Sequence, residues 1–447
     1  VMTTLRLWWL LRRRSTGSTD PAGLTGVLAV IAFAVTTAVA LVVVGGLSAF
    51  VQRAAVATGT DYDDSSIYVF LAIFATLLLL IPLGTLGGAA ARLAVSRRDA
   101  RLASLRLAGA TTTQVAALTV GDAAVQALTG AVIGIAGYGA LLPVVAQLRF
   151  QGRTFEVAEL WVGVPGLLAA AAGIVLVALV SAVSSLGRVA ITPLGVASRV
   201  TPPGLKVARV VAVVAVAAIS AVFASGVINV AGLVGIFVLM GFIAAGMATL
   251  NLLGPFLLGL VGKIVAKRAT SVATLLAGRR LADDPKTAWR SVGGVALATF
   301  IAGITAIAAL FSSGAQSGDP DAILMTDLGT GGLLTLAIAG VLAAVSTGVM
   351  QAGRVIDQRD AYRNLVLAGT DQSTLDQARF RETLIPLAAA VGSSAIVMLA
   401  LAAPMVGFGA FTQPIVLIQY VLSIAAAVAL VLAGSAATRV IARRVVA

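Results

Sequence analysis

The chain carries the stretch Arg98-Asp99-Ala100-Arg101-Leu102-Ala103-Ser104-Leu105-Arg106-Leu107-Ala108-Gly109 and, later, the related stretch Arg359-Asp360-Ala361-Tyr362-Arg363-Asn364-Leu365-Val366-Leu367-Ala368-Gly369. The Arg-Asp-Ala triplets lie 261 positions apart and the Leu-x-Leu-Ala-Gly ends 260 positions apart, so one residue has been lost between the copies. Each copy lies between two long apolar runs. A motif that returns at one distance in the same setting indicates a duplicated membrane unit.

The composition excludes an ordinary soluble domain. Hydrophobic residues make up 59% of the chain, charged residues 11%, and the mean hydropathy is +1.04. Such values are typical of a polytopic membrane protein. The sequence has no Cys and no His, which excludes disulfides, thiolate metal sites, cysteine nucleophiles and histidine proton relays.

Apolar runs long enough to cross a bilayer, at about 20 residues each, predict ten transmembrane helices. They fall at 22–49, 67–91, 114–147, 159–185, 208–227, 231–261, 290–311, 329–351, 378–404 and 414–437.

The segments between these runs differ sharply in charge from one side to the other. Of the 31 Lys and Arg residues, 28 belong to one side, and only Arg53, Arg149 and Arg153 belong to the other. The positive-inside rule therefore predicts that both termini are cytoplasmic. It also means that the net charge of +13 records topology and contact with anionic membrane lipid, not nucleic acid binding.

A basic, Trp-containing segment at 2–14 is typical of a helix lying flat on the inner membrane surface. A cleaved signal peptide also begins basic and turns apolar, but no clear cleavage site follows, so a retained helix is expected. The same order returns later: Leu10-Leu11, Arg13-Arg14 and Asp20-Pro21 have the counterparts Leu275-Leu276, Arg279-Arg280 and Asp284-Pro285.

The predicted fold is an all-α polytopic membrane protein with ten helices arranged as 4 + 2 + 4. Its parts are a four-helix unit at 1–200, a two-helix linker region at 201–267 and a second four-helix unit at 268–447. Both units enter from the cytoplasm, so the repeats are parallel. The longest outer loops, near 50–66 and 312–328, are too short to fold a large extracytoplasmic domain.

The outer segments carry more acidic than basic residues. An acidic outer mouth would attract cationic solutes, although exclusion of positive residues from that side explains the bias equally well. The acidic residues are Asp61, Asp63, Asp64, Glu156, Glu159, Asp319, Asp321 and Asp327.

Two carboxylates, Asp122 and Glu382, lie inside predicted spans and occupy equivalent positions 260 residues apart. An ionised carboxylate facing lipid costs roughly 2.5 kcal/mol or more, so each should face the protein interior, an aqueous cavity or a basic partner. A proton or cation relay is one interpretation. A structural role, with bonds to nearby Arg or backbone groups, is favoured over it.

Small residues follow each carboxylate at a spacing of three or four. Such a ladder lets two helix backbones approach closely, so we expect helix packing there. The ladders are Gly130, Gly134 and Gly137 in one half and Ala390 and Ser394, with Gly392 between them, in the other.

The sequence offers no nucleotide-hydrolysing loop, since Val261-Gly262-Lys263-Ile264 lacks both the leading Gly and the hydroxyl residue of a P-loop. No His-based zinc site or triad is possible. The Asp61-Tyr62-Asp63-Asp64 stretch could hold a divalent cation weakly, but an exposed acidic turn is expected. Neither a catalytic residue nor a cofactor is predicted on this chain.

The order of these features resembles the FtsX-like permeases of ABC transporters. Each half has an interfacial segment with Arg-Arg and Asp-Pro, two spanning helices, a basic turn ending in Leu-x-Leu-Ala-Gly, and a helix with an early carboxylate. The stretch Thr192-Pro193-Leu194-Gly195-Val196-Ala197-Ser198-Arg199 is similar to the family's Pro-x-x-x-x-Arg ending, with the Arg one position late.

The resemblance implies a mechanotransmitting permease in the bacterial plasma membrane, served by a separate cytoplasmic ATPase, expected to be a dimer, that holds ATP and Mg. It places the ATPase-coupling residues in the two repeated stretches. They are Arg98, Asp99, Ala100, Leu105, Leu107, Gly109, Arg359, Asp360, Ala361, Leu365, Leu367 and Gly369. Family members linked to antimicrobial-peptide resistance carry large extracytoplasmic domains, whereas this chain has short outer loops.

The function expected from the resemblance is ATP-driven export or membrane extraction of an amphipathic peptide, drug or lipid. Two alternatives are an ion- or proton-coupled transporter using Asp122 and Glu382, and a sensing complex that signals without transport.

Overall fold

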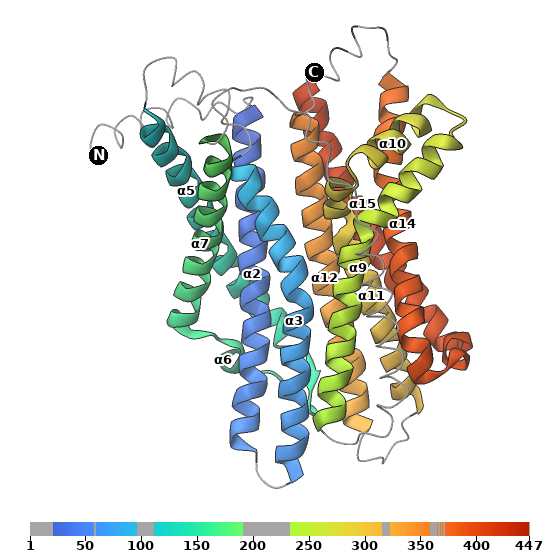
Figure 1. Ribbon diagram of the computed structural model, residues 1–447. Coiled ribbons are helices and arrows are strands. Elements are labelled where there is room, and N and C mark those ends of the chain that lie inside the picture. Colours follow the sequence, from blue (N-terminus) through green and yellow to red (C-terminus); the bar gives the residue numbers. More distant parts are fainter. Residues whose placement is uncertain are drawn as a thin grey trace. The chain divides into compact units, whose positions relative to one another are not determined.

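The computed structural model describes residues 21–57, 60–95, 111–190, 233–314, 322–357, 364, 367, 369 and 372–446. The chain divides into two compact units, one built from 1–199, 348–359 and 435–447 and the other from 200–347 and 360–434. Figure 1 shows that both consist of long helices. The all-α polytopic fold predicted from composition is confirmed at this level.

Nine helices in the described part of the chain are long and apolar enough to cross a membrane. They correspond to nine of the ten predicted runs. The run at 208–227 and the interfacial segment at 2–14 lie outside the described residues.

Four long helices form the core of unit 1. They are α2 (Pro21–Val56), α3 (Thr60–Val95), α5 (Thr112–Val145) and α7 (Gly163–Ala190). Helix α2 packs against α3, α5 and α7, and α3 also packs against α5 and α7.

The predicted outer loop at 50–66 is wrong, because α2 continues to Val56 and α3 begins at Thr60. Hydropathy ends a run at the first polar residues, but the backbone hydrogen bonds of a helix continue through them. With 36 residues and a rise of ~1.5 Å per residue, α2 is about 54 Å long, whereas the hydrocarbon core is ~30 Å thick. The ends of α2 and α3 therefore extend beyond the hydrocarbon.

The small-residue ladder of α5 brings it into backbone contact with α2. A Cβ added at Gly134 would lie 2.5 Å from the carbonyl oxygen of Ala34, and one at Gly130 would lie 2.5 Å from Cβ of Phe33. At Gly137 the nearest atom, Cβ of Ala38, is at an ordinary 3.6 Å. Gly130 and Gly134 thus lie where α5 approaches the backbone of α2 most closely among the three glycines of this ladder.

The connection between α5 and α7 is more ordered than a plain loop. Strands β1 (Arg149–Phe150) and β2 (Arg153–Thr154) form an antiparallel hairpin, and the short helix α6 (Val157–Leu160) follows. Gln151 and Gly152 have φ values of 57° and 73°, as a two-residue type I′ turn requires. The candidate span Val157–Ser184 corresponds to the predicted run at 159–185, but its long helix, α7, begins only at Gly163, whose φ is 71°.

Unit 2 contains most of the remaining helices. They are α9 (Leu233–Lys267), α10 (Val272–Asp283), α11 (Pro285–Gly314), α12 (Ala322–Asp357), α14 (Gln372–Val406), the 3₁₀ helix η1 (Phe408–Thr412) and α15 (Pro414–Val446). The last turns of α12 and α15 are assigned to unit 1.

Helix α11 begins at Pro285, five residues before the predicted run at 290–311. The carboxylate of Asp284 accepts a hydrogen bond from the backbone N–H of Thr287 at 3.1 Å, and proline suits the first helical position because it lacks an N–H. The amphipathic segment before it forms helix α10, which packs against α9, α11 and α14. Helix α9, from the predicted linker region, also packs against α11 and α14.

In the second ladder, Ala390 and Ser394 are fully buried on α14. The Ser394 hydroxyl donates to the carbonyl oxygen of Ala296 in α11 at 2.6 Å, so α14 and α11 are held by a hydrogen bond as well as by packing. Gly392 does not belong to this contact, because it is exposed and no atom lies within 4 Å of a Cβ built on it. It follows Ala390 by two residues and therefore faces away.

Gly134→Ala should destabilise unit 1 by about 1–3 kcal/mol, because its methyl group meets helix backbone that cannot move aside without separating α5 from α2. The matched control is Gly139→Ala on the same helix, where nothing lies within 4 Å of the added Cβ. That variant should be neutral or more stable by up to ~1 kcal/mol. Thermal unfolding of the full chain in one detergent measures both, and equal shifts would contradict the close approach.

Candidate functional site

The two coupling stretches are described only in part. All the predicted coupling residues of the first copy, and Arg359, Asp360, Ala361 and Leu365 of the second, lie outside the described residues. Leu367 and Gly369 are described. The Leu367 side chain is 76% exposed, and Gly369 lies in an exposed turn with a φ of 86°.

Helix α5 begins immediately after the first stretch with a full capping box. The backbone N–H of Gln114 donates to the Thr111 hydroxyl at 3.3 Å, and the backbone N–H of Thr111 donates to Gln114 Oε1 at 3.1 Å. These bonds satisfy donors that the start of a helix leaves unpaired. The end of the first stretch is therefore joined to a firmly defined helix start.

Glu382, on α14 after the second stretch, is paired. Its Oε1 accepts a hydrogen bond from Arg280 Nη1 on α10 at 2.7 Å, and its side chain is 17% exposed. The neighbouring Arg381 donates to the hydroxyls of Ser271 and Thr274 at the start of α10. We call this set of contacts the α10–α14 junction.

At the α10–α14 junction, the basic partner of the Glu382 carboxylate is Arg280. The partner is 102 residues away in sequence, so local inspection of the sequence could not find it. The predicted repeat gave the only signal, because it placed Arg279-Arg280 and the carboxylate in the same order in both halves. The pairing favours the structural interpretation of Glu382 over an ion relay.

Asp122 lies on α5 in unit 1 and is half-buried. Its side chain or backbone takes part in at least one polar or electrostatic interaction, so it is not without a partner. Asp122 and Glu382 belong to different units, and the structure describes each within its own helix bundle.

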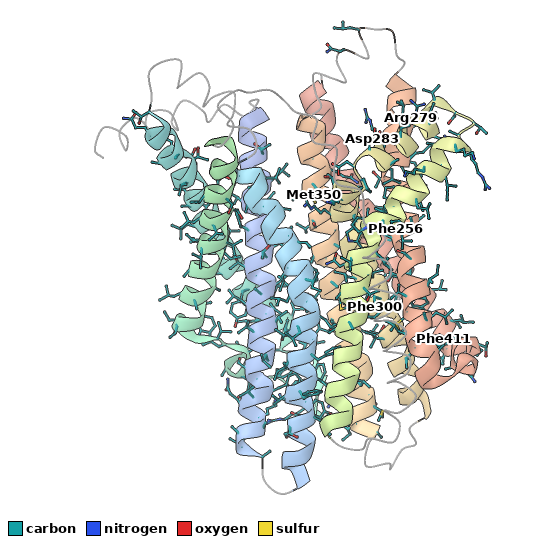
Figure 2. All side chains as sticks on the ribbon, in the orientation of Figure 1. Phe256, Arg279, Asp283, Phe300, Met350 and Phe411 are labelled. Atoms are coloured by element: carbon teal, nitrogen blue, oxygen red, sulfur yellow. The ribbon has the colours of Figure 1, made fainter. Side chains whose placement is uncertain are left out.

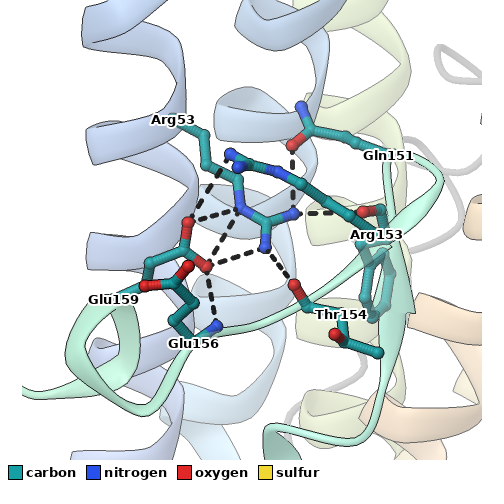
Figure 3. Close-up of polar contacts among 7 residues, drawn as sticks. Arg53, Gln151, Arg153, Thr154, Glu156 and Glu159 are labelled. Atoms are coloured by element: carbon teal, nitrogen blue, oxygen red, sulfur yellow. Dashed lines mark hydrogen bonds and ion pairs between the residues drawn. The ribbon is translucent and has the colours of Figure 1, made fainter.

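Arg53, which the sequence marked only as a cation of the outer side, makes several side-chain hydrogen bonds within the described part of unit 1. Arg53, near the end of α2, is 2% exposed in its side chain and lies 2.7 Å from Glu159 of α6. Its guanidinium also donates to the carbonyl oxygens of Phe150 and Thr154, both at 3.0 Å, as Figure 3 shows. It lies 4.3 Å from the ring centre of Phe155. We call these contacts the Arg53 clamp.

Aromatic rings surround the Arg53 clamp. Phe50 of α2 stacks with Tyr68 of α3 at 5.8 Å between ring centres, and contacts Phe150 and Phe155 edge-on at 5.5 and 5.4 Å. Deeper in the unit, the Tyr138 hydroxyl donates to the carbonyl oxygen of Leu160 at 2.5 Å. The connection between α5 and α7 is thus held to the helix bundle both by hydrogen bonds and by contacts between aromatic rings.

The Arg53 clamp accounts for one of the acidic residues expected on the outer side, while Glu156 is exposed and Asp319 and Asp321 lie outside the described residues. Glu159 is neutralised by Arg53 and lies 3.5 Å from Arg153, and Asp327 is buried on α12. Asp61, Asp63 and Asp64 are not in a turn between helices but belong to the first turns of α3. Among the described residues no group of acidic side chains is placed to hold a metal ion.

Known proteins were compared with the chain at the level of family, sequence and structure. Residues 86–194 match the FtsX-like permease C-terminal family. The match to the FtsX-like family runs from the end of α3 through α5 to α7 and encloses the first coupling stretch. It covers less than half of the chain. No curated protein and no solved structure shows a significant match.

The FtsX-like match supports an ABC-transporter permease, as the resemblance in the sequence implied. With nine candidate spans among the described residues, the chain is a multi-pass membrane protein, and the match and the spans together point to the plasma membrane. FtsX-like permeases generally pair with a cytoplasmic ABC ATPase.

Arg53→Ala should destabilise unit 1 by about 3 kcal/mol, because it leaves Glu159 and two carbonyl oxygens without their partner. Arg53→Lys should recover only part of the loss, since an ammonium group cannot reproduce the fork of a guanidinium. Thermal unfolding of the full chain is the measurement. Arg153→Ala is the matched control. Its side chain is 58% exposed, so its removal should cost less than ~1 kcal/mol, and a loss as large as that of Arg53→Ala would contradict the clamp.

Arg280→Gln and Glu382→Gln should show a coupling of about 1 kcal/mol or less in a double-mutant cycle on unfolding. The value is modest because the Arg280 side chain is 37% exposed and solvent screens the pair. Arg279→Gln, which neutralises the exposed neighbour, should show no coupling with Glu382→Gln. A coupling of equal size at both arginines would mean that Glu382 responds to general positive charge and not to a defined pair.

Proposed function

We propose that the chain is the membrane-spanning permease of an ATP-driven transporter, and that its two repeated stretches dock a separate cytoplasmic ABC ATPase. The observation that carries the proposal is the FtsX-like match, which encloses the first stretch and the helices that follow it. The second stretch repeats its Leu-x-Leu-Ala-Gly end 260 residues later. One chain would then supply two docking sites to an ATPase dimer that holds ATP and Mg.

The described part of the second stretch suits a docking role. Leu367 is largely exposed and lies between the end of α12 and the start of α14, on the side that carries most of the Lys and Arg. An aliphatic side chain exposed outside the bilayer is available to a protein partner. Its counterpart in the first copy is Leu107.

The helices that follow the stretches are suited to transmit motion. In unit 2, α14 begins at Gln372 and is bound to α10 through Arg381 and Glu382. In unit 1, α5 begins at its capping box and packs against α2 through Gly130 and Gly134. Displacement of either stretch by the ATPase would move a closely packed pair of helices as one body.

The substrate class follows from what surrounds the helices. Within the described residues, α5 and α7 are connected by the β1–β2 hairpin and α6, which the Arg53 clamp holds to α2. This connection is too short to form a separate binding domain. Helix α7 buries little of its surface, so a ligand dissolved in the membrane can reach it laterally. We therefore favour export or extraction of an amphipathic peptide, drug or lipid. The exposed aliphatic residues of α7 are Val164, Leu168, Leu176, Val177, Val180 and Val183.

Purification of the tagged full chain from its native host should bring an ATPase with it. Leu107→Arg combined with Leu367→Arg should remove most of that ATPase or uncouple its hydrolysis from the permease, because a charge replaces an apolar contact in each stretch. Gly369→Arg is a poorer test, since a φ of 86° strains any side chain there. The matched control is Val157→Arg, an exposed aliphatic position on α6, which should leave the ATPase bound.

Two outcomes would overturn parts of this proposal. If no ATPase co-purifies and transport persists in ATP-depleted vesicles with an imposed proton gradient, the chain is an ion-coupled carrier, and neutralising Asp122 and Glu382 should then abolish transport. If an ATPase binds but no substrate moves in vesicles, the complex signals without transport.

A further inference from the structure

Exposed cations gather where α9 turns into α10. Lys263, Lys267, Arg268 and Arg279 all have exposed side chains. None of them takes part in an ion pair within the described part of the chain. Asp283 and Asp284 at the end of α10 are exposed acidic residues, so four exposed cations face two exposed carboxylates and the local balance stays positive. We call these four cations and the helix ends that carry them the α9–α10 corner.

The backbones of the two helices touch at the α9–α10 corner. A Cβ added at Gly262 would lie 2.7 Å from the backbone nitrogen of Ala282, and one at Gly278 would lie 2.6 Å from that of Ala266. Lys263, Lys267 and Arg279 each directly follow a residue of these contacts, namely Gly262, Ala266 and Gly278. They are held together by the two glycine contacts and not by flexible chain.

The depth of the α9–α10 corner is fixed by the spans it joins. The candidate span of α9 ends at Lys267, and that of α11 begins at Pro285. Helix α10 connects the two, so it lies at the level where both spans leave the hydrocarbon. Figure 2 shows Arg279 and Asp283 at this end of unit 2. That level is occupied by lipid headgroups.

The two faces of α10 differ in what they carry. Ala273, Ala277, Gly278 and Leu281 form the buried face toward the bundle. The outward face presents Val272, which is well exposed, and Arg279. On α9, Ile264 is likewise exposed beside Lys263. Aliphatic side chains interleaved with cations suit a surface that inserts between acyl chains while it contacts anionic headgroups.

We propose that the α9–α10 corner binds the headgroup of an anionic phospholipid in the leaflet on the Lys- and Arg-rich side. Charge complementarity and depth both favour a lipid. A free phosphate would use the cations but would leave the exposed Val272 and Ile264 without a partner. The site requires no ATPase, so it stands or falls independently of the proposed function.

The test is titration of the full chain in a zwitterionic detergent with phosphatidylglycerol and, separately, with phosphatidylcholine, using native mass spectrometry to count bound lipid. The unaltered chain should bind phosphatidylglycerol more tightly. Lys263→Gln, Lys267→Gln and Arg279→Gln together should weaken that preference at least about tenfold, because each cation near a membrane surface contributes about fivefold. The charge-keeping set Lys263→Arg, Lys267→Arg and Arg279→Lys should retain it, and so should Arg149→Gln, an exposed cation of unit 1.

Three results would overturn the proposal. The neutral triple variant could keep the full preference for phosphatidylglycerol. Inorganic phosphate could displace the lipid completely from the unaltered chain, which would show an adventitious ion only. The triple variant could lose a co-purifying ATPase while it keeps its lipid preference, which would make the corner a protein-docking surface.

Discussion

Every backbone N–H and C=O in the hydrocarbon must find its partner within the protein, because the lipid offers none. This constraint explains why the described chain consists almost entirely of long helices and why several of them continue past the bilayer. A helix that has begun keeps its hydrogen bonds as it reaches polar residues such as Arg53. It also explains where irregular structure occurs: the β1–β2 hairpin and α6 lie between helices, where Arg53 takes up two of their carbonyl oxygens.

With the backbone satisfied internally, contact between helices depends on how closely they approach. Lipid chains are as apolar as leucine, so packing and short hydrogen bonds decide which helices associate. Gly130 and Gly134 bring α5 onto α2, and Ser394 bonds α14 to α11. Gly262 and Gly278 act in the same way between α9 and α10. Small residues therefore set the geometry from which the charged side chains project.

Hydropathy was sufficient to predict the nine membrane spans of the described part of the chain, and small-residue spacing drew attention to Gly130 and Gly134, which lie where α5 meets α2. They failed at helix ends, because hydropathy stops at Asp64 or Arg53 whereas the hydrogen-bond ladder does not. They also failed where a partner is distant in sequence. Glu382 stood out as a carboxylate in a span, but Arg280 could be recognised as its partner only in three dimensions. The two coupling stretches came from the repeat, and of their predicted residues the structure describes Leu367 and Gly369.

The Arg53 clamp has a consequence for how the protein is made. Arg53 is one of few cations on the side that the positive-inside rule leaves poor in them, and its carboxylate partner is 106 residues further along the chain. With the predicted cytoplasmic N-terminus, α2 is translated and crosses the membrane well before Glu159 is made. The ion pair can form only once α3 and α5 have been inserted and α6 has emerged. The stable placement of α2 therefore depends on correct insertion of the helices that follow it.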